Sequence, residues 1–438
     1  MRQVIHYIGK NKIFALLNKL IPTFNGFLTV FVIIRTIPKY EFGLLTLINT
    51  FDLVVFAISG GLILQALEKY AAETTGTELD DLITNSVFLY GTLSLVPAVL
   101  IAFSSTYIAN ILNAESLSNL LKLLPLIVIS LWSRNLAHFI LLAKERLKEV
   151  FIVDFVPFLI TVILILALYF SNNLNSAMII IIVRIISNFG ATIVILAYLK
   201  KDIKLRMNLN KYWINKLLSF GKYSFGTTIG NIIHTRIDTL MIAYFYDPFV
   251  LAMYSSARRI ADFFRNFVQA ANMIVLPRAS NLFSKNDLRG VRTIYYKGII
   301  FSLILVLPIA LTMILIPNFV LYLAYGSKYQ DGANILLLFA ICSLISPFGT
   351  IGSSVAAGIG KPNFTFIAMW LSVVVNVCLN LVLIPKYGAI GAAYATLVAM
   401  IVGGLIITIL IHRMVNLSLT VDNKSFVNGL ILLFRSKR

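Results

Sequence analysis

The stretch NVCLNLVLIPKYGAIGAAYAT (376–396) joins two long apolar runs and limits the folds that the chain can adopt. Pro385 and Gly388 bound a segment with the residues of a tight turn. Small residues such as Gly391 and Ala395 follow, and small residues let two membrane helices approach closely. The flanking runs, 364–385 and 389–411, each exceed the roughly 20 residues that cross a hydrocarbon core of about 30 Å. The stretch therefore predicts two membrane-spanning helices joined by a tight turn.

The rest of the chain has the same apolar character. Of its 438 residues 59% are hydrophobic and 13% are charged, and the mean hydropathy is +0.89, which excludes an ordinary soluble protein. Hydropathy and length predict about twelve spans. They lie near 13–37, 41–66, 83–109, 118–143, 150–171, 176–199, 218–245, 248–276, 297–317, 332–357, 364–385 and 389–411. We therefore expect an all-α polytopic membrane protein.

Charge predicts how the chain is oriented in the membrane. The formal net charge is +19, but most of the 37 Lys and Arg residues fall on the side of the membrane that holds both termini. The opposite loops hold only Lys39, Lys122, Lys328 and Lys386. By the positive-inside rule both termini are cytoplasmic. The basic character thus indicates topology and contact with anionic lipid, and we expect no nucleic acid partner.

The longest polar segment, KKDIKLRMNLNKYWINKLLSFG (200–221), divides the spans six and six, and we expect it to be a cytoplasmic linker between two bundles. We expect an N-terminal six-helix bundle (1–210), a C-terminal six-helix bundle (211–412) and a cytoplasmic basic tail (413–438). The turns IPKYEFGL (37–44) and YDPFVLAM (246–253) are weakly similar. This similarity indicates two repeats in the same orientation, with a central cavity between them.

Nothing in the sequence predicts an enzyme. The external loops are too short for a catalytic domain, so we expect no catalytic residues. Cys342 and Cys378 both fall within apolar runs, which leaves neither a disulfide framework nor a CxxC metal site. We expect no metal and no cofactor.

One predicted span carries several charges. Tyr254, Arg258, Asp262, Arg265 and Gln269 follow helical spacing and share one face. An arginine at the centre of a membrane helix costs about 2.5 to 3.5 kcal/mol, so these side chains must face protein or water. The face has two cations and one anion, and Arg259 adds a cation. Two interpretations stay open: ion pairs that tie helices together, or a site for an anionic cargo, because the guanidinium fork suits phosphate.

Other spans carry similar polar faces. The candidate arginines for cargo binding are Arg258, Arg265, Arg259, Arg134, Arg184 and Arg236. The candidates for a coupling-ion or gating role are Asp238, Asp262, Asp154, His138 and His234, since buried carboxylates and imidazoles can titrate near neutral pH. For the two histidines, a satisfied interior imidazole is the alternative. Asn49 and Asp52 are expected to make hydrogen bonds between helices.

Three segments carry a family resemblance. GKPN (360–363) with 376–396, KYEFG (39–43), and GKYSFG (221–226) leading to AMYSSA (252–257) resemble the polysaccharide flippases of the MOP superfamily, in particular Wzx-type O-antigen and repeat-unit transporters. The resemblance implies a MATE-like, V-shaped fold of two lobes and alternating access. It also implies outward transport of undecaprenyl-pyrophosphate-linked oligosaccharide across the bacterial inner membrane. Polysaccharide polymerase and chain-length machinery are further expected partners.

Three other functions compete with this interpretation. A MATE-type multidrug or cation exporter would need an acidic cavity, whereas basic residues outnumber acidic ones in these spans. A membrane glycosyltransferase or polymerase would need catalytic carboxylates and usually a substantial external loop. A scaffold without transport is the last alternative.

Overall fold

The computed structural model describes residues 28–199 and 209–414, together with Phe14, Leu17, Asn18, Ile21, 24–26 and Arg206; side chains are left out at 29–30, 197–199, 263–267, 270, 271 and 273. Over these ranges the chain is helical and contains no strand. The long helices are α3 (Lys39–Ser59), α4 (Gln65–Glu73), α5 (Gly76–Phe103), α8 (Leu124–Ala143), α9 (Leu147–Phe170), α10 (Ala177–Leu199), α11 (Lys211–Phe245), α12 (Pro248–Ser284), α13 (Leu288–Leu315), α14 (Pro317–Tyr325), α15 (Ala333–Gly358) and α16 (Pro362–Met414). The shorter elements are the helices α2 (Ile34–Thr36), α6 (Ser105–Ile111) and α7 (Leu117–Lys122), the π-helical segments η1 (Thr29–Ile33) and η2 (Gly60–Leu64), and the 3-10 helix η3 (Ser327–Gly332).

The described residues include eight helical stretches that are long and apolar enough to cross a membrane. The first combines α3, η2 and α4 over Lys39–Glu73, and the last is the whole of α16. α11 and α12 are long enough as well, but they are more polar and are not among the eight. The expectation of an all-α polytopic membrane protein is confirmed. Most of the predicted first span and of the basic tail lies outside the described residues.

The turn in 376–396 forms as predicted. α16 contains two helices that meet at Gly388, whose φ is +58° and ψ −138°. This backbone conformation favours glycine, since a Cβ there would be strained. At Gly391 an added Cβ would lie 2.2 Å from the carbonyl oxygen of Leu383, so the second helix starts against the end of the first. The two predicted spans are thus two helices with a sharp break between them.

By Cα proximity the described chain forms two compact units. Unit 1 comprises Met1–Ser256 and Leu321–Asp331, and unit 2 comprises Ala257–Val320 and Gly332–Arg438. α11 belongs to unit 1, although the sequence assigned 211–412 to the C-terminal bundle. The six-and-six division of the spans stays a prediction.

The polar segment 200–221 is a shorter linker than expected, because α11 begins at Lys211. The Asn210 side chain caps this helix by accepting a hydrogen bond from the Tyr212 amide at 2.9 Å. Trp213, Leu217 and Gly221 are buried on one face, which makes the start of α11 amphipathic. The interpretation of 211–221 as linker was therefore wrong.

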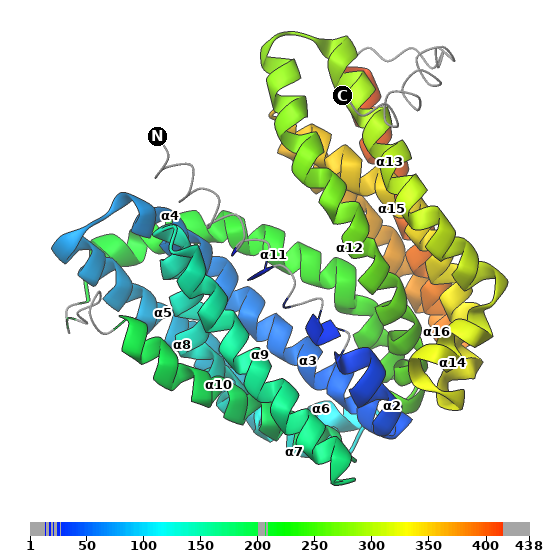
Figure 1. Cartoon of the computed structure of the whole chain (residues 1–438), viewed down its shortest axis with the longest axis horizontal. Coiled ribbons are helices and arrows are strands. Elements are labelled where there is room, and N and C mark those ends of the chain that lie inside the picture. Colours follow the sequence, from blue (N-terminus) through cyan, green and yellow to red (C-terminus); the bar gives the residue numbers. More distant parts are fainter. Residues whose placement is uncertain are drawn as a thin grey trace. The chain divides into compact units, whose positions relative to one another are not determined.

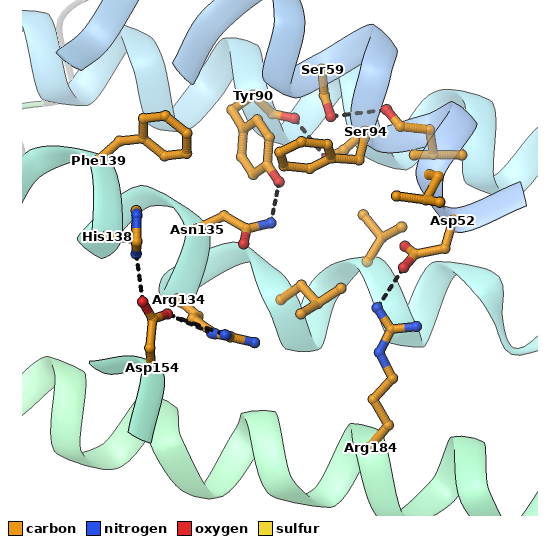
Figure 2. A pocket seen from close by; sticks show the side chains of 15 residues that line it. Asp52, Ser59, Tyr90, Ser94, Arg134, Asn135, His138, Phe139, Asp154 and Arg184 are labelled. Carbon is orange, nitrogen blue, oxygen red and sulfur yellow. Dashed lines mark hydrogen bonds and ion pairs between the residues drawn. The ribbon is translucent and has the colours of Figure 1, made fainter. Parts of the chain in front are cut away.

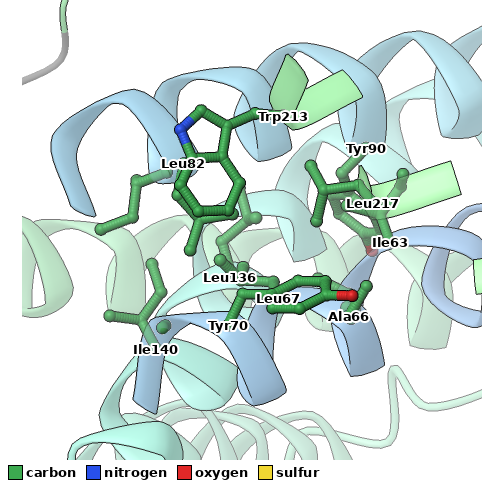
Figure 3. Packing of buried hydrophobic residues seen from close by; sticks show 13 residues of the cluster. Ile63, Ala66, Leu67, Tyr70, Leu82, Tyr90, Leu136, Ile140, Trp213 and Leu217 are labelled. Atoms are coloured by element: carbon green, nitrogen blue, oxygen red, sulfur yellow. The ribbon is translucent and has the colours of Figure 1, made fainter. Parts of the chain in front are cut away.

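A hydrophobic cluster joins α11 to the N-terminal helices of unit 1. Trp213 and Leu217 pack with Leu67, Tyr70 and Leu82 of α4 and α5 (Figure 3). Gly221 permits this approach, since a Cβ there would lie 1.9 Å from the Leu62 carbonyl oxygen. In Figure 1, α3, α8, α9 and α10 run side by side within the same unit.

Unit 2 has its own core between α12, α13, α15 and α16. Val275, Tyr295, Val355 and Ile407 are buried members of this cluster. The Tyr295 hydroxyl lies 2.9 Å from that of Thr408, which fixes α13 against α16.

The segment Leu321–Asp331 lies in unit 1 although the helices on either side belong mainly to unit 2. The Lys39 ammonium contacts Asp331 at 3.1 Å, and Lys328 donates to the carbonyl of Arg35. Nearby, the two similar turns found in the sequence meet, because a Cβ at Gly43 would lie 1.9 Å from the Pro248 carbonyl oxygen. These contacts hold the segment Leu321–Asp331 and the turn at Pro248 against the start of α3 within unit 1.

Candidate functional site

Unit 1 contains a polar cavity of about 400 Å³ between its membrane-spanning helices. Its lining comes from α3, α5, α8, α9 and α10. The charged side chains in the lining are Asp52, Arg134, His138, Asp154 and Arg184 (Figure 2). Four of these five were candidate site residues in the sequence, so the fold brings together groups that are up to 132 residues apart.

A tight turn between α8 and α9 places Asp154 of α9 beside the middle of α8. α8 ends at Ala143 and Glu145 adopts a φ of +56°, which reverses the chain into α9. Arg134 and Asp154 are equally far from Lys144 along the sequence, so the two antiparallel helices place them at the same depth. Arg134 is near the centre of α8, about 15 Å from each end at the usual helical rise.

Asp154 receives hydrogen bonds from two sides. The Nε and Nη2 atoms of Arg134 donate to its Oδ1 at 3.2 and 3.1 Å, and Nδ1 of His138 lies 2.9 Å from its Oδ2. An ionised carboxylate only accepts, so Nδ1 of His138 carries a hydrogen in this arrangement. The Asp154 side chain is 12% exposed, while those of Arg134 and His138 are 29% exposed. The carboxylate is thus enclosed by its partners, and both partners face the cavity.

Arg184 forms the second charged group of the cavity. Its Nη1 donates to Oδ1 of Asn49 at 3.1 Å, and its Nη2 donates to Oδ2 of Asp52. These bonds join α10 to α3, as the sequence predicted for Asn49 and Asp52. The Asp52 side chain is 12% exposed and that of Arg184 is 30% exposed, so the guanidinium borders the cavity.

A neutral pair lies between the two charged groups. Nδ2 of Asn135 donates to the Tyr90 hydroxyl at 2.8 Å, and Figure 2 shows this pair between the Asp154 group and the Asp52–Arg184 pair. Tyr90, Ser94 and Asn135 also line the cavity but were not among the site residues predicted from the sequence. Tyr90 and Ser94 are one helical turn apart in an apolar helix, and Asn135 is adjacent to Arg134, so polar spacing was an available signal.

The predicted charged face of α12 is described in part. Arg258 is 8% exposed, and its Nε lies 3.7 Å from Oδ2 of Asp262, one turn further along the helix. The Arg265 side chain lies outside the described residues. Arg259 is half-buried on the same helix. Residues Ala257–Val320 belong to unit 2, so Arg258 and Asp262 are in a different unit from the cavity.

Asp238 of α11 has a partner within unit 1. The Tyr254 hydroxyl donates to its Oδ2 at 2.6 Å, and both side chains are fully buried. Arg236 and His234 are on the same helix and are half-buried. The structure thus groups Arg134, His138, Asp154 and Arg184, holds Asp238 against Tyr254, and pairs Arg258 with Asp262.

The charges of the cavity nearly balance. Two guanidinium groups face two carboxylates, and His138 adds a positive charge only when it is protonated. Within the described residues, no group of three or more His, Cys, Asp and Glu side chains could hold a metal ion. The arrangement offers two guanidinium groups to which another anion could bind in place of a carboxylate.

The chain is similar to one protein family and to several transport proteins. The family described as "Polysaccharide biosynthesis protein" matches residues 32–334. A probable low-salt glycan biosynthesis flippase of Haloferax volcanii is 26% identical over 180 residues, which are 41% of this chain and 38% of that protein. A putative O-antigen transporter of Shigella flexneri is 23% identical over 249 residues, which are 56% of this chain and 58% of that protein. The matched stretches thus span about half or less of these relatives.

Two solved structures share the fold. A lipid II flippase in an inward closed conformation has a TM-score of 0.75 and 17% identity, and the match covers 97% of this chain and 91% of that one. An inward-facing multidrug resistance MATE family transporter of the MOP superfamily has a TM-score of 0.72 and 14% identity, with 91% and 94% covered. At these identities the likeness establishes the fold alone.

Proposed function

The chain belongs to the polysaccharide biosynthesis protein family, and from this premise we propose that it is a flippase that carries a polyprenyl-diphosphate-linked oligosaccharide across the membrane. It would act as a transporter by alternating access and not as an enzyme. The flippase and O-antigen transporter names of the relatives support this cargo class.

The observation that carries the proposal is the charged face of α12. Over 258–265 this helix carries three arginines and one aspartate, and Arg258 is buried within 4 Å of that aspartate. By sequence these four residues carry a formal charge of +2. A diphosphate is an anion, and a guanidinium can bind its oxygens with two parallel hydrogen bonds. We propose Arg258, Arg259 and Arg265 as the headgroup-binding residues, with Arg236 of α11 as a further contact.

The cavity of unit 1 would have a second role in transport. Arg134 and Arg184 are each held by a carboxylate, so an incoming anion must compete with Asp154 or Asp52 for them. Protonation of the Asp154–His138 pair would weaken the hold on Arg134. We propose that this group responds to a coupling proton or ion and that Asp238 contributes to gating; Asp262, the remaining candidate, is the carboxylate partner of Arg258.

We further propose a bacterial inner-membrane location with both termini in the cytoplasm. The uneven distribution of Lys and Arg supports this orientation. In this orientation the cargo would be loaded from the cytoplasmic leaflet and released to the outer one, where polymerase and chain-length machinery could receive it.

A double substitution separates cargo binding from a structural ion pair. In a strain that lacks its own flippase, the wild-type chain should restore surface polysaccharide and Arg258→Ala should not. If Arg258 only neutralises Asp262, the variant R258A/D262A should recover polymer output, because neither charge is then left unpaired. If Arg258 binds the headgroup, the double variant should stay inactive at normal protein level. Full output from R258A/D262A would overturn the assignment of Arg258.

A multidrug exporter is the rival function on the same fold. Organic cations need a surplus of acidic groups, whereas the cavity of unit 1 is balanced and α12 has an excess of cations. Uptake of organic cations into vesicles that contain the chain, at rates above empty vesicles, would favour the exporter.

A further inference from the structure

Unit 2 contains a second polar pocket, of about 550 Å³, between the end of α12 and the start of α13. It is lined by Pro277, Arg278, Asn281, Leu282, Gly290, Thr293, Ile294 and Lys297. Two of these side chains are cationic, two are neutral and polar, and none is acidic. The pocket begins at Pro277, 12 residues after Arg265 on the same helix, and shares no residue with the candidate cargo site on α12.

The cations of this pocket have no carboxylate partner among the residues that the structure describes. No ion pair involves Arg278 or Lys297, in contrast to Arg134, Arg184 and Arg258. The nearest acid in the sequence, Asp287, caps α13 by accepting a hydrogen bond from the Gly290 amide at 2.8 Å. The two cations and the Asn281 amide are donors suited to phosphate oxygens, whereas the Thr293 hydroxyl already donates to the Arg289 carbonyl oxygen at 2.9 Å.

The pocket lies at the depth of lipid headgroups. From 298 to 315 α13 contains no charged residue, and at about 1.5 Å per residue this run measures roughly 27 Å. That length matches a hydrocarbon core of about 30 Å, so Lys297 marks the boundary between acyl chains and headgroups.

Apolar side chains continue from the pocket toward the membrane interior. Ile274 lies one turn before Arg278 on α12 and is 53% exposed. On α13, Phe301 and Ile304 follow Lys297 at helical spacing and are 36% and 42% exposed. An amphiphile whose phosphate binds Arg278 and Lys297 could lay its acyl chains along these side chains.

We propose that this pocket binds the phosphate of a membrane lipid. Basic pockets between membrane helices at the headgroup level are sites of this kind. The chain's own tail is an unsuitable occupant, because beyond Met414 it carries Lys424, Arg435, Lys437 and Arg438 against the single acid Asp422. The bound lipid is either an anionic phospholipid of the bilayer or the polyprenyl diphosphate of the cargo, which share this headgroup chemistry.

The test compares two double variants of the full chain. R278Q/K297Q removes the pocket cations, and K285Q/R289Q removes the same charge from exposed positions of the same hairpin outside the pocket lining. Binding of phosphatidylglycerol, polyprenyl diphosphate, phosphatidylcholine and inorganic phosphate is measured by titration in detergent with native mass spectrometry. Loss of each cation should weaken lipid-phosphate binding about fivefold, which corresponds to roughly 1 kcal/mol per cation.

The proposal predicts this weakening for R278Q/K297Q and not for K285Q/R289Q. Tighter binding of phosphatidylglycerol identifies a bilayer lipid as the occupant, and tighter binding of polyprenyl diphosphate identifies the cargo carrier. Equal binding by both double variants, or inorganic phosphate binding as tightly as the lipids, would overturn the proposal. Melting of each variant in detergent micelles without added lipid checks folding, and the readout does not depend on flipping.

Discussion

The cavity of unit 1 and the α12–α13 pocket of unit 2 are both lined by cationic side chains, but these cations differ in their carboxylate partners. In the cavity Arg134 and Arg184 are each held by a carboxylate, whereas Arg278 and Lys297 have none among the described residues. The difference follows from depth. A cation at the middle of a membrane helix loses its hydration and needs a partner, and a cation at the headgroup level keeps water and lipid phosphate within reach. A carboxylate partner is therefore expected for the cations of the deep cavity, and none is needed for those of the pocket at the headgroup level.

Asp154→Ala should have the largest effect on stability. The change leaves the Arg134 guanidinium in the cavity without its carboxylate and also removes the partner of His138. Breaking a buried pair typically costs about 3 to 5 kcal/mol. The free energy of unfolding in detergent micelles measures this loss, and a loss below about 1 kcal/mol would show that water already satisfies Arg134.

The effects of substituting Asp52 and Arg184 on the free energy of unfolding should not be additive. Asp52→Ala and Arg184→Ala should each lower this free energy, and the double variant should lower it by roughly 0.5 to 3 kcal/mol less than the sum of the two single losses. The reason is that each single change leaves the other charge unpaired. A double-mutant cycle measured by unfolding gives this coupling directly, and additive losses would contradict the pairing.

Asn135→Ala tests the neutral pair between the charged groups. The variant loses the 2.8 Å bond to the Tyr90 hydroxyl, so we expect a loss of about 1 kcal/mol. Tyr90→Phe removes the same bond from the other side and serves as the matched control. Because the Tyr90 hydroxyl also contacts the Ser59 side chain, Tyr90→Phe should lose at least as much as Asn135→Ala, and no loss from either variant would contradict the pairing.

Arg278→Ala should have the smallest effect. The side chain is exposed and makes no ion pair within the described part of the chain, so the unfolding free energy in a neutral detergent should change by less than about 0.5 kcal/mol. A larger loss would mean that the pocket is part of the folded core, which would remove the contrast with the cavity.

Much of the fold could be predicted from the sequence. Apolar runs and the turn at Gly388 are local properties. The family resemblance is confirmed by the family match over 32–334, which includes KYEFG (39–43) and ends before 376–396. The start of α11 was missed, because its lysines resemble a linker when the buried face of Trp213 and Leu217 is not considered.

The candidate site was harder to predict. Helical spacing identified Arg134, His138 and Arg184, but spacing cannot tell which carboxylate meets which guanidinium across a bundle. Asp52 was expected to make a hydrogen bond between helices, and the structure pairs it with Arg184. The assignment of cargo arginines on α12 stays a prediction, since it depends on a ligand.

The most direct test of the central claim is a flipping assay with the purified chain in liposomes. A polyprenyl-diphosphate oligosaccharide is placed in one leaflet, and its arrival in the other is followed by accessibility to an added glycosidase. Our account predicts rapid arrival with the wild-type chain and arrival at the rate of empty liposomes with R258A/D262A. Equal rates for wild-type and empty liposomes, or full activity of the double variant, would contradict it.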